Sequence, residues 1–450
     1  MILFNQQKHR KRFNPAKFLL LGYLSVILLG AVLLMLPISH QAGVNVTPLM
    51  AIFTSTSATS ITGLVVTNTA ETWSMFGRVV ILCLIQLGAL GFMTLTTIFF
   101  FLMNKKIGLS QRLLIAQSFN LRDRQGVVRL ICHVLIGTLI IQGIGTLLLW
   151  VRFVPSHGAW RGLGMGAFHA IAAFANAGFD LFGGSYNPLA DDGVMAATVM
   201  LLAIIGGLGF FVWEDLYQNK FRLKRLHLHS KLVLSISFWL IVLGWIFFFV
   251  AERGNPYTIG HMNLPDAIQT SLFQSVMPRS AGFSIIEQGQ LFGVTRMVVM
   301  MLMFIGGSAG STAGGVKNVT VGILFLSAIH YFRGKKEVSA FSRTIPMPQI
   351  KSALAISVIV LCAILFGSIT IALLQPYLSF SAILFEVISA IATCGLSYGI
   401  TGVLSPASQV VIIIFMFCGR VGIMTLGMAA FLKRDVVEKI KYPDTWVMMG

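Results

Sequence analysis

Four glycines with similar surroundings are the residues of this chain best placed to do chemistry. Each ends a short, weakly apolar stretch with an aromatic residue near its start, and each is followed by Leu or Phe. Glycine reaches positive φ without a Cβ clash, so the carbonyl groups beside it can turn toward a common axis. Four such carbonyl sets meeting at one place could replace the hydration shell of a cation. The stretches are FTSTSATSITG, FHAIAAFANAG, LFQSVMPRSAG and FEVISAIATCG, ending at Gly63, Gly178, Gly282 and Gly395.

A second set of glycines follows at a nearly constant distance and indicates an internal repeat. A further glycine lies three positions later in three of the four cases, at Gly91, Gly209 and Gly422. Such a repeat constrains the architecture more than any single motif. We expect the second set mainly to allow close helix packing, as small residues do in membranes. The second set lies 25, 28, 24 and 24 residues after the first and comprises Gly88, Gly206, Gly306 and Gly419.

The composition places these glycines in a membrane protein. Of the 450 residues, 56% are hydrophobic and 11% are charged, whereas soluble proteins carry roughly 25% charged residues. A membrane-spanning helix needs about 20 apolar residues. The four glycine-ended stretches are too short to span and are typical of re-entrant half-helices. Eight longer apolar runs are candidate spans, of which the sixth is overlong and interrupted by glycines: 18–36, 79–103, 130–151, 193–213, 232–251, 297–332, 353–375 and 409–432.

The formal charge of +18 indicates how these spans are oriented. Five basic segments carry 25 of the 33 Lys and Arg residues, the segments between them carry six, and Lys317 and Arg420 lie inside apolar runs. The positive-inside rule predicts a multi-pass plasma-membrane protein with both termini in the cytoplasm. Cations spread over short loops, without a recognition module, argue against nucleic-acid binding. The basic segments are 1–17, 104–129, 214–231, 333–351 and 433–450.

Together these patterns predict an all-α polytopic membrane protein with eight transmembrane helices in the lipid bilayer. The helices would form four span–pore-loop–span repeats with fourfold pseudosymmetry around a central pore. The C-termini of the four half-helices would direct their partial negative charge toward this pore. The predicted segments are a cytoplasmic N-terminus (1–17), repeat 1 (18–103), repeat 2 (104–213), repeat 3 (214–332), repeat 4 (333–432) and a cytoplasmic tail (433–450).

The sixth apolar run contains ten consecutive small residues that cannot hold a regular helix well, because each glycine costs about 1 kcal/mol relative to alanine. We expect two half-helices joined by an intramembrane loop on the cytoplasmic side of the third glycine segment. A kinked packing helix is the alternative. The loop comprises Gly306, Gly307, Ser308, Ala309, Gly310, Ser311, Thr312, Ala313, Gly314 and Gly315, with Lys317 just beyond it.

Two motif matches in this loop indicate a second class of function. Gly306 to Gly310 matches the G-x-S-x-G nucleophile elbow, which would make Ser308 a nucleophile with Lys317 or a histidine as its base. That motif requires a strand–turn–helix setting, which an apolar helical run does not offer. The segment from Gly310 to Lys317 resembles a phosphate-binding loop, but Val316 interrupts it and no strand precedes it. An intramembrane serine hydrolase is therefore an alternative, whereas the preferred interpretation needs no catalytic residue.

Arg420 lies in the middle of the eighth run, where a charge is costly and therefore indicates function. It occupies the repeat position of Ala89, Gly207 and Gly307, which places it near the permeation path below the filter. Two roles are open, namely a fixed cation that speeds release of a bound ion and a structural salt bridge to a carboxylate. Lys317 either reaches the cytoplasmic face or contacts the loop.

Three polar residues lie around the outer part of the glycine segments. Asp180 and Glu386 form either an acidic entry, which would raise the local cation concentration, or ordinary solvated loop carboxylates. His169 lies in the second half-helix, where we expect it to pack or to cap.

The four segments, read as TSITG, ANAGF, RSAGF and ATCGL within span–pore–span repeats, resemble the Trk/Ktr/HKT superfamily of potassium transporters. Over nearly its whole length the chain looks like the membrane subunit of a bacterial Ktr system. The resemblance implies a selectivity filter with a single glycine from each repeat. Glycine at the first position, Gly63, resembles potassium-preferring members, whereas serine there is common in sodium-preferring ones. The implied potassium-binding residues are Thr62, Gly63, Ala177, Gly178, Ala281, Gly282, Cys394 and Gly395.

The same resemblance implies potassium uptake gated by the 306–317 loop, with Arg420 lining the pore. A sodium-preferring transporter of the same fold is the alternative. The family usually has x-Gly-Pro-Leu after this arginine, whereas this chain has Val421-Gly-Ile-Met424, so the local helix geometry is in doubt. Potassium is then the substrate, sodium couples to or stimulates transport, and no cofactor is expected.

The resemblance also implies partners. They are a second copy of the chain in a homodimer and a cytoplasmic ring of separate regulatory subunits that bind nucleotide (ATP or ADP). The ring would dock on the basic inner loops, and the short amphipathic tail 433–450 fits a position at a subunit interface.

Overall fold

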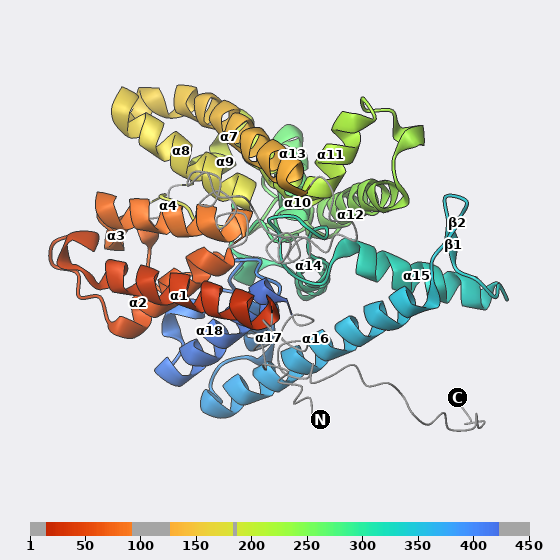
Figure 1. Ribbon diagram of the computed structural model, residues 1–450. Helices are drawn as coiled ribbons and strands as arrows, with labels where there is room; N and C mark the ends of the chain where they lie inside the picture. The colour runs from red at the N-terminus through yellow and green to blue at the C-terminus, as the bar shows by residue number, and fades with distance from the viewer. Residues whose placement is uncertain (1–14, 92–126, 183–186, 423–450) are drawn as a thin grey trace, which may run out of the picture.

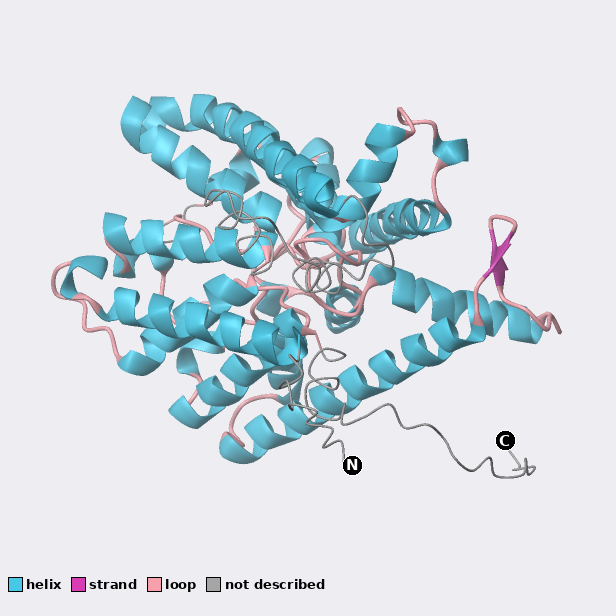
Figure 2. Ribbon diagram, in the orientation of Figure 1, coloured by secondary structure: helices cyan, strands magenta, loops and turns pink. Residues whose placement is uncertain are grey.

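The computed structural model describes residues 15–91, 127–182 and 187–422, which are mostly helical (Figure 2). The predicted docking tail 433–450 lies outside the described residues, as do residues 1–14 and 104–126 of the basic segments. In the first half of the chain the elements are α1 (Pro15–Met35), η1 (Pro37–Ser39), α2 (Pro48–Ser60), α3 (Thr69–Thr72), α4 (Met75–Leu90), α7 (Val127–His157), α8 (Ala159–Ala175), α9 (Pro188–Asp191), α10 (Gly193–Leu208) and α11 (Phe210–Gln218).

The second half of the chain repeats this order of long and short helices. A two-stranded antiparallel hairpin projects from the body where α15 meets α16 (Figure 1). The elements are η2 (Leu223–Arg225), α12 (Leu228–Glu252), α13 (Leu264–Val276), η3 (Gln288–Gln290), α14 (Gly293–Phe304), α15 (Asn318–Phe332), β1 (Ser339–Ala340), β2 (Arg343–Thr344), α16 (Met347–Leu374), α17 (Phe380–Ile391), η4 (Thr401–Val403) and α18 (Pro406–Val421).

Three helices of the described part are long and apolar enough to cross a membrane: α7, α12 and α16. The pair α10 and α11 forms a fourth candidate if it is counted as one span, although the two helices meet at 89°. The sixth apolar run divides into α14 and α15, as expected from its glycines. The remaining apolar helices are shorter, so the eight-span arrangement stays a prediction.

The shorter helices end at glycines that the repeat had singled out. Gly91, Gly209 and Gly422 follow α4, α10 and α18 directly, with φ of 78°, 96° and 86°. A residue at positive φ ends a helix readily, and glycine adopts that conformation without steric cost. The fourth apolar run was expected to be one span; in the structure Gly209 divides it into α10 and α11, which meet at 89°.

Capping residues determine where several of the helices begin. The side chain of Thr47 accepts a hydrogen bond from the Met50 amide at the start of α2, and Pro48 occupies its first turn. Ser379 caps α17 and Asp192 caps α10 in the same way. Each cap satisfies backbone donors that the first helical turn leaves unpaired.

Glycines in the last turn of α4, α10 and α18 allow close packing on the half-helices. At Gly88, Gly206 and Gly419 an added Cβ would collide with a backbone carbonyl oxygen. The packing role expected for these three positions is therefore confirmed. Gly306 differs, because an added Cβ there would collide with the intramembrane loop at Gly314. The three carbonyl groups belong to Thr59, Phe174 and Ile391, each four residues before a filter glycine.

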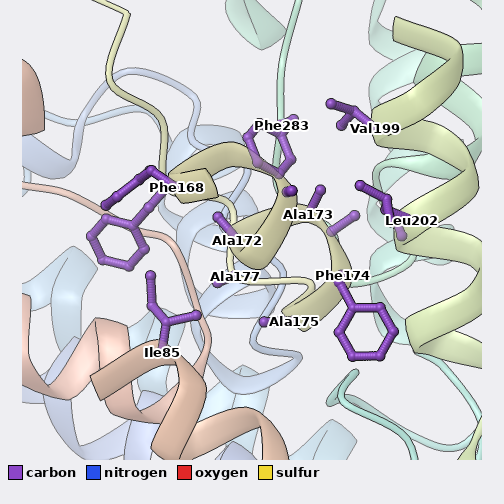
Figure 3. Close-up of a cluster of buried hydrophobic side chains, with 14 of the residues drawn as sticks. Ile85, Phe168, Ala172, Ala173, Phe174, Ala175, Ala177, Val199, Leu202 and Phe283 are labelled. Atoms are coloured by element: carbon purple, nitrogen blue, oxygen red, sulfur yellow. The ribbon is translucent and has the colours of Figure 1, made fainter. Parts of the chain in front are cut away.

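Half-helix α8 contributes many residues to a cluster of buried hydrophobic side chains. Figure 3 shows Phe168 and Phe174 on this helix, with Ile85 of α4 and Leu202 of α10 on either side of it. Alanines fill the contacts between them, which brings the helix backbones close together. By contrast, α16 exposes large apolar side chains such as Phe366 (72%) along its length. An exposed apolar surface of this kind suits a lipid environment.

The packing of α4 gives a stability prediction. We expect Gly88→Ala to lower the melting temperature of the purified protein by several degrees, because the new methyl group overpacks a buried contact, at about 1–3 kcal/mol. Gly143→Ala in α7 is the control, since nothing lies within 4 Å of an added Cβ there. The control should match or exceed the wild type, because alanine favours helix more than glycine does. Equal melting temperatures for the two variants would contradict this account.

Candidate functional site

The four filter glycines lie side by side in a closed ring that follows their order in the chain. A Cβ on Gly178 would lie 3.0 Å from Cα of Gly282 and 3.4 Å from the carbonyl oxygen of Ala281. The ring therefore has no room for a side chain at any of the four positions. On the other three glycines an added Cβ would collide with a carbonyl oxygen of the next segment, that of Ala177 for Gly63, of Cys394 for Gly282 and of Thr62 for Gly395.

The four segments share one unusual backbone conformation. The glycines have φ of 87°, 65°, 76° and 94° in chain order. The residue two positions before each glycine also has positive φ, and this feature was not foreseen. β-Branched residues such as Ile and Thr rarely adopt it, so the surrounding structure must hold them there. These left-handed residues are Ile61 (58°), Asn176 (56°), Ser280 (74°) and Thr393 (46°).

Two buried serines hold the glycine amides of the first and fourth segments. Ser57 Oγ accepts a hydrogen bond from Gly63 N at 3.1 Å, and Ser389 Oγ accepts one from Gly395 N at the same distance. Both serines lie six residues before their glycine, and this shared spacing was the sequence signal that could have identified them. Ala172 occupies the corresponding position in the second repeat.

The half-helices direct their C-termini at the ring. Helices α2, α8, α13 and α17 end three to six residues before their filter glycines. The unpaired carbonyl groups of a helix C-terminus carry partial negative charge. Four such termini around one ring of carbonyl groups produce a site that favours a cation over an anion.

Polar side chains of two half-helices hold the chain beyond the ring. Glu386 is buried, and its carboxylate accepts hydrogen bonds from Tyr398 N at 3.1 Å and from two hydroxyl groups. His169 Nε2 accepts one from Leu181 N at 3.2 Å. Tyr398 and Leu181 each lie three residues after a filter glycine, so the two contacts are equivalent. The reading of Glu386 as a solvated carboxylate was therefore wrong, whereas the capping expectation for His169 is confirmed.

Asp180 lies in the segment that follows Gly178. Its carboxylate accepts a hydrogen bond from Phe182 N at 3.1 Å. Burial raises the pKa of Asp180 to about 6, and this hydrogen bond opposes the shift. The carboxyl group is therefore mainly ionised at neutral pH and loses its negative charge as the pH falls below about 6.

The glycine-rich stretch forms a loop between α14 and α15, as predicted. Its two ends are joined, because Gly306 N donates to Val316 O at 3.0 Å and Val316 N donates to Phe304 O at 3.2 Å. The loop contacts α10 through Ser308 N, which donates to Gly207 O at 3.0 Å. The segment between α14 and α15 is therefore a loop held by hydrogen bonds and not a kinked packing helix.

Arg420 fastens the loop to the first repeat. Its guanidinium donates to the carbonyl oxygen of Thr312, with Nη1 at 2.6 Å, and to that of Gly88. No carboxylate of the described residues pairs with it, so the salt-bridge alternative was wrong within this part of the chain. The side chain lies at the loop, and its place beside a permeation path stays a prediction. Lys317 also contacts the loop, since its Nζ donates to Ala313 O at 2.8 Å.

Arg279 lies close to α12 and to the start of α15, although the count of cations per segment had assigned it to an outer segment. It was counted with the six cations of the outer segments. Its guanidinium instead donates to Ser237 Oγ of α12 at 3.1 Å, and the same hydroxyl accepts from Asn318 Nδ2, at the start of α15, at 2.9 Å. Arg279 therefore lies beside the loop.

Ser308 lacks the surroundings of a nucleophile. Its hydroxyl donates to the carbonyl oxygen of Leu208 at 2.6 Å, and Lys317 is engaged with Ala313. A nucleophilic serine needs a base within hydrogen-bond reach of its hydroxyl, and these contacts provide none.

Comparison with known proteins identifies the family. Residues 18–439 match the TrkH family, described as cation transport proteins. The chain belongs to this family. A cation transporter is not an enzyme, so the alternative of an intramembrane serine hydrolase is wrong. The protein is accordingly embedded in a membrane, in agreement with its apolar helices.

Individual relatives cover nearly the whole chain. A potassium/sodium uptake protein NtpJ of Enterococcus hirae is 37% identical and covers 99% of both chains. A Ktr system potassium uptake protein B of Bacillus subtilis is 39% identical, over 98% of this chain and 97% of its own. The crystal structure of the potassium transporter TrkH from Vibrio parahaemolyticus has the same fold, with a TM-score of 0.76 at 16% identity, over 94% of this chain and 86% of that one.

The serine contacts of the filter give a prediction for the site. Ser57→Ala removes the acceptor of the buried Gly63 amide, which costs about 1–3 kcal/mol. We expect a changed ratio of sodium to rubidium flux in liposomes. Ser55→Ala is the matched control, because Ser55 lies on the same helix and binds Ile27 O of α1 at 2.7 Å. The control should lower the melting temperature while the flux ratio stays unchanged; a shift of the ratio in both variants would count against a specific role for Ser57.

Proposed function

We propose that this chain takes up potassium through a filter built from its four glycine segments. The observation that carries the proposal is the closed ring in which each glycine lies against the carbonyl group next to the following glycine. Carbonyl oxygens in such a ring can replace the water around an ion without the dehydration penalty. The proposed ion-binding residues are Thr62, Gly63, Ala177, Gly178, Ala281, Gly282, Cys394 and Gly395.

The names of the relatives support potassium as the substrate. One is a potassium uptake protein, and another is a potassium/sodium uptake protein. Glycine at all four filter positions favours potassium, and a sodium-preferring transporter of the same fold is the second candidate. Flux of rubidium and of sodium through the purified protein in liposomes tests the function directly.

The loop of residues 306–317 is the proposed gate. It contacts residues of the second and third repeats, and Arg420 of the fourth repeat joins it to Gly88 of the first. A segment held from several sides directly below a filter obstructs the path when it is seated. Arg420 and Lys317 add positive charge there, which raises the energy of a cation beside them. Moving the loop would therefore open the path.

The larger architecture is part of the proposal. It comprises eight membrane spans in four pseudosymmetric repeats, with the predicted residue bounds given above. The protein would lie in the plasma membrane with both termini in the cytoplasm. We further propose a homodimer controlled by a separate cytoplasmic subunit that binds ATP or ADP. The Ktr system names of two relatives support a multi-component system, and the basic inner segments provide a surface for such a partner.

Replacing the first filter glycine tests the ion preference. Gly63→Ser should raise sodium flux relative to rubidium flux by about tenfold, or ~1.4 kcal/mol of lost discrimination. The physical reason is that φ of 87° strains a non-glycine residue and the added Cβ would push Ala177 away, which widens the ring. The measurement is paired sodium and rubidium uptake into liposomes. A ratio that stays constant would favour the sodium-preferring alternative.

Shortening the loop tests the gate. Deletion of residues 309–314 should increase rubidium flux severalfold, because the obstruction is removed. The structure permits this deletion, since Gly306 and Gly315 already lie in contact and two residues remain to join them. Melting temperature serves as the folding control. Unchanged flux through a folded variant would contradict the gating role.

A further inference from the structure

Ser280 joins the filter to the intramembrane loop through a single hydroxyl group. Its Oγ donates to the carbonyl oxygen of Thr393 at 2.8 Å, which belongs to the fourth filter segment. The same oxygen accepts a hydrogen bond from the amide of Gly314 at 2.9 Å, which belongs to the loop. One side chain of the third repeat thus connects the backbones of two functional parts that are distant in sequence.

A second contact of the same kind lies in the neighbouring segment. The side-chain amide of Asn176 is 2.8 Å from Thr312 Oγ1, on the loop. Asn176 and Ser280 occupy equivalent positions, two residues before Gly178 and Gly282, and both have positive φ. The left-handed residues of two adjacent filter segments therefore provide the surface on which the loop rests.

The third such residue limits how closely the loop can approach. Thr393, two residues before Gly395, packs against Gly314, where an added Cβ would lie 3.0 Å from the Ala392 carbonyl oxygen and collide with the Thr393 hydroxyl. Only glycine fits at this point of the loop. Ile61 of the first repeat has no polar side chain to offer, so the coupling is confined to one side of the ring.

Because Ser280 is buried, the loss of its hydrogen bonds would cost more free energy than the loss of exposed ones. Ser280 is fully buried, and Thr393 is 1% exposed. A buried polar group that loses its partner cannot turn to water, so the loss costs more than an exposed hydrogen bond. Departure of the loop would leave the Ser280 oxygen without its donor and free its hydroxyl to rotate away from the Thr393 carbonyl.

We propose that Ser280 is a positioning residue that makes the ion preference of the filter depend on the seating of the loop. The inference rests on the proposed function and deepens it. With the loop seated, the Gly314 amide and the Thr393 carbonyl together fix the hydroxyl, and the carbonyl is held in the direction that the ring requires. With the loop displaced, this carbonyl loses its fixed partner, so opening and reduced discrimination go together.

Two substitutions distinguish the effect of the Ser280 hydroxyl from the effect of the strained backbone at this residue. Ser280→Ala removes the hydroxyl and keeps a side chain at φ of 74°, whereas Ser280→Gly removes the hydroxyl and relieves the strain. In liposomes containing the full chain, both variants should raise the ratio of sodium to rubidium flux by about fivefold, the factor expected for loss of one ordinary hydrogen bond. A wild-type ratio in Ser280→Gly would overturn the proposal.

A control and a second background complete the test. Ser275→Ala removes a hydroxyl from α13 that binds Ile241 O at 2.7 Å, away from the loop, and should leave the flux ratio unchanged. In the variant lacking residues 309–314, Ser280→Ala should have no further effect, because its partner Gly314 is absent. An undiminished effect in that background would show that Ser280 acts without the loop. Failure of the wild-type protein to conduct either ion would instead contradict the proposed function itself.

Discussion

Backbone polar groups of non-helical segments inside a membrane have no water to bind. This constraint applies to every part of the central site. The filter segments and the intramembrane loop are non-helical, so their amides and carbonyls need partners from within the protein. Buried hydroxyl groups, notably those of Ser57, Ser280 and Ser389, supply many of them. Arg420 supplies two donors for carbonyls from different repeats.

The same constraint explains how the proposed filter would bind an ion. Amides of the filter segments are engaged by hydroxyl groups and by carbonyls of the half-helices. The carbonyl groups next to the glycines instead face the neighbouring segment, where a ring of oxygens can take the place of water around a cation. Side chains at the ring are excluded by space, as the collisions at Gly63 and Gly395 show. Selectivity in such a site depends on backbone direction, and hence on the residues that hold the backbone.

Sequence reasoning succeeded where residue type is forced and failed where several types would serve. Gly178 could be singled out because the repeat marks it, and the structure shows that no other residue fits its conformation and its surroundings. The broken sixth run was equally clear from its small residues. By contrast, Ser280 is one of many serines, and Thr393 carries no mark of its left-handed backbone. The partners of Arg420 could not be predicted, because carbonyl groups occur at every residue and only the folded chain shows which of them lie within reach.

Two of the described inner helices break in unequal ways, and for the proposed gate this has a consequence for motion. Between α10 and α11 the break is the single residue Gly209, whereas between α14 and α15 it is a loop anchored at both ends by Phe304, Gly306 and Val316. A pore with four equal breaks would widen symmetrically. Among the described residues the proposed gate belongs to one wall only, so displacement of this loop would open the passage from one side. Ions would then leave along an off-centre route, past the face that Ser280 and Asn176 form.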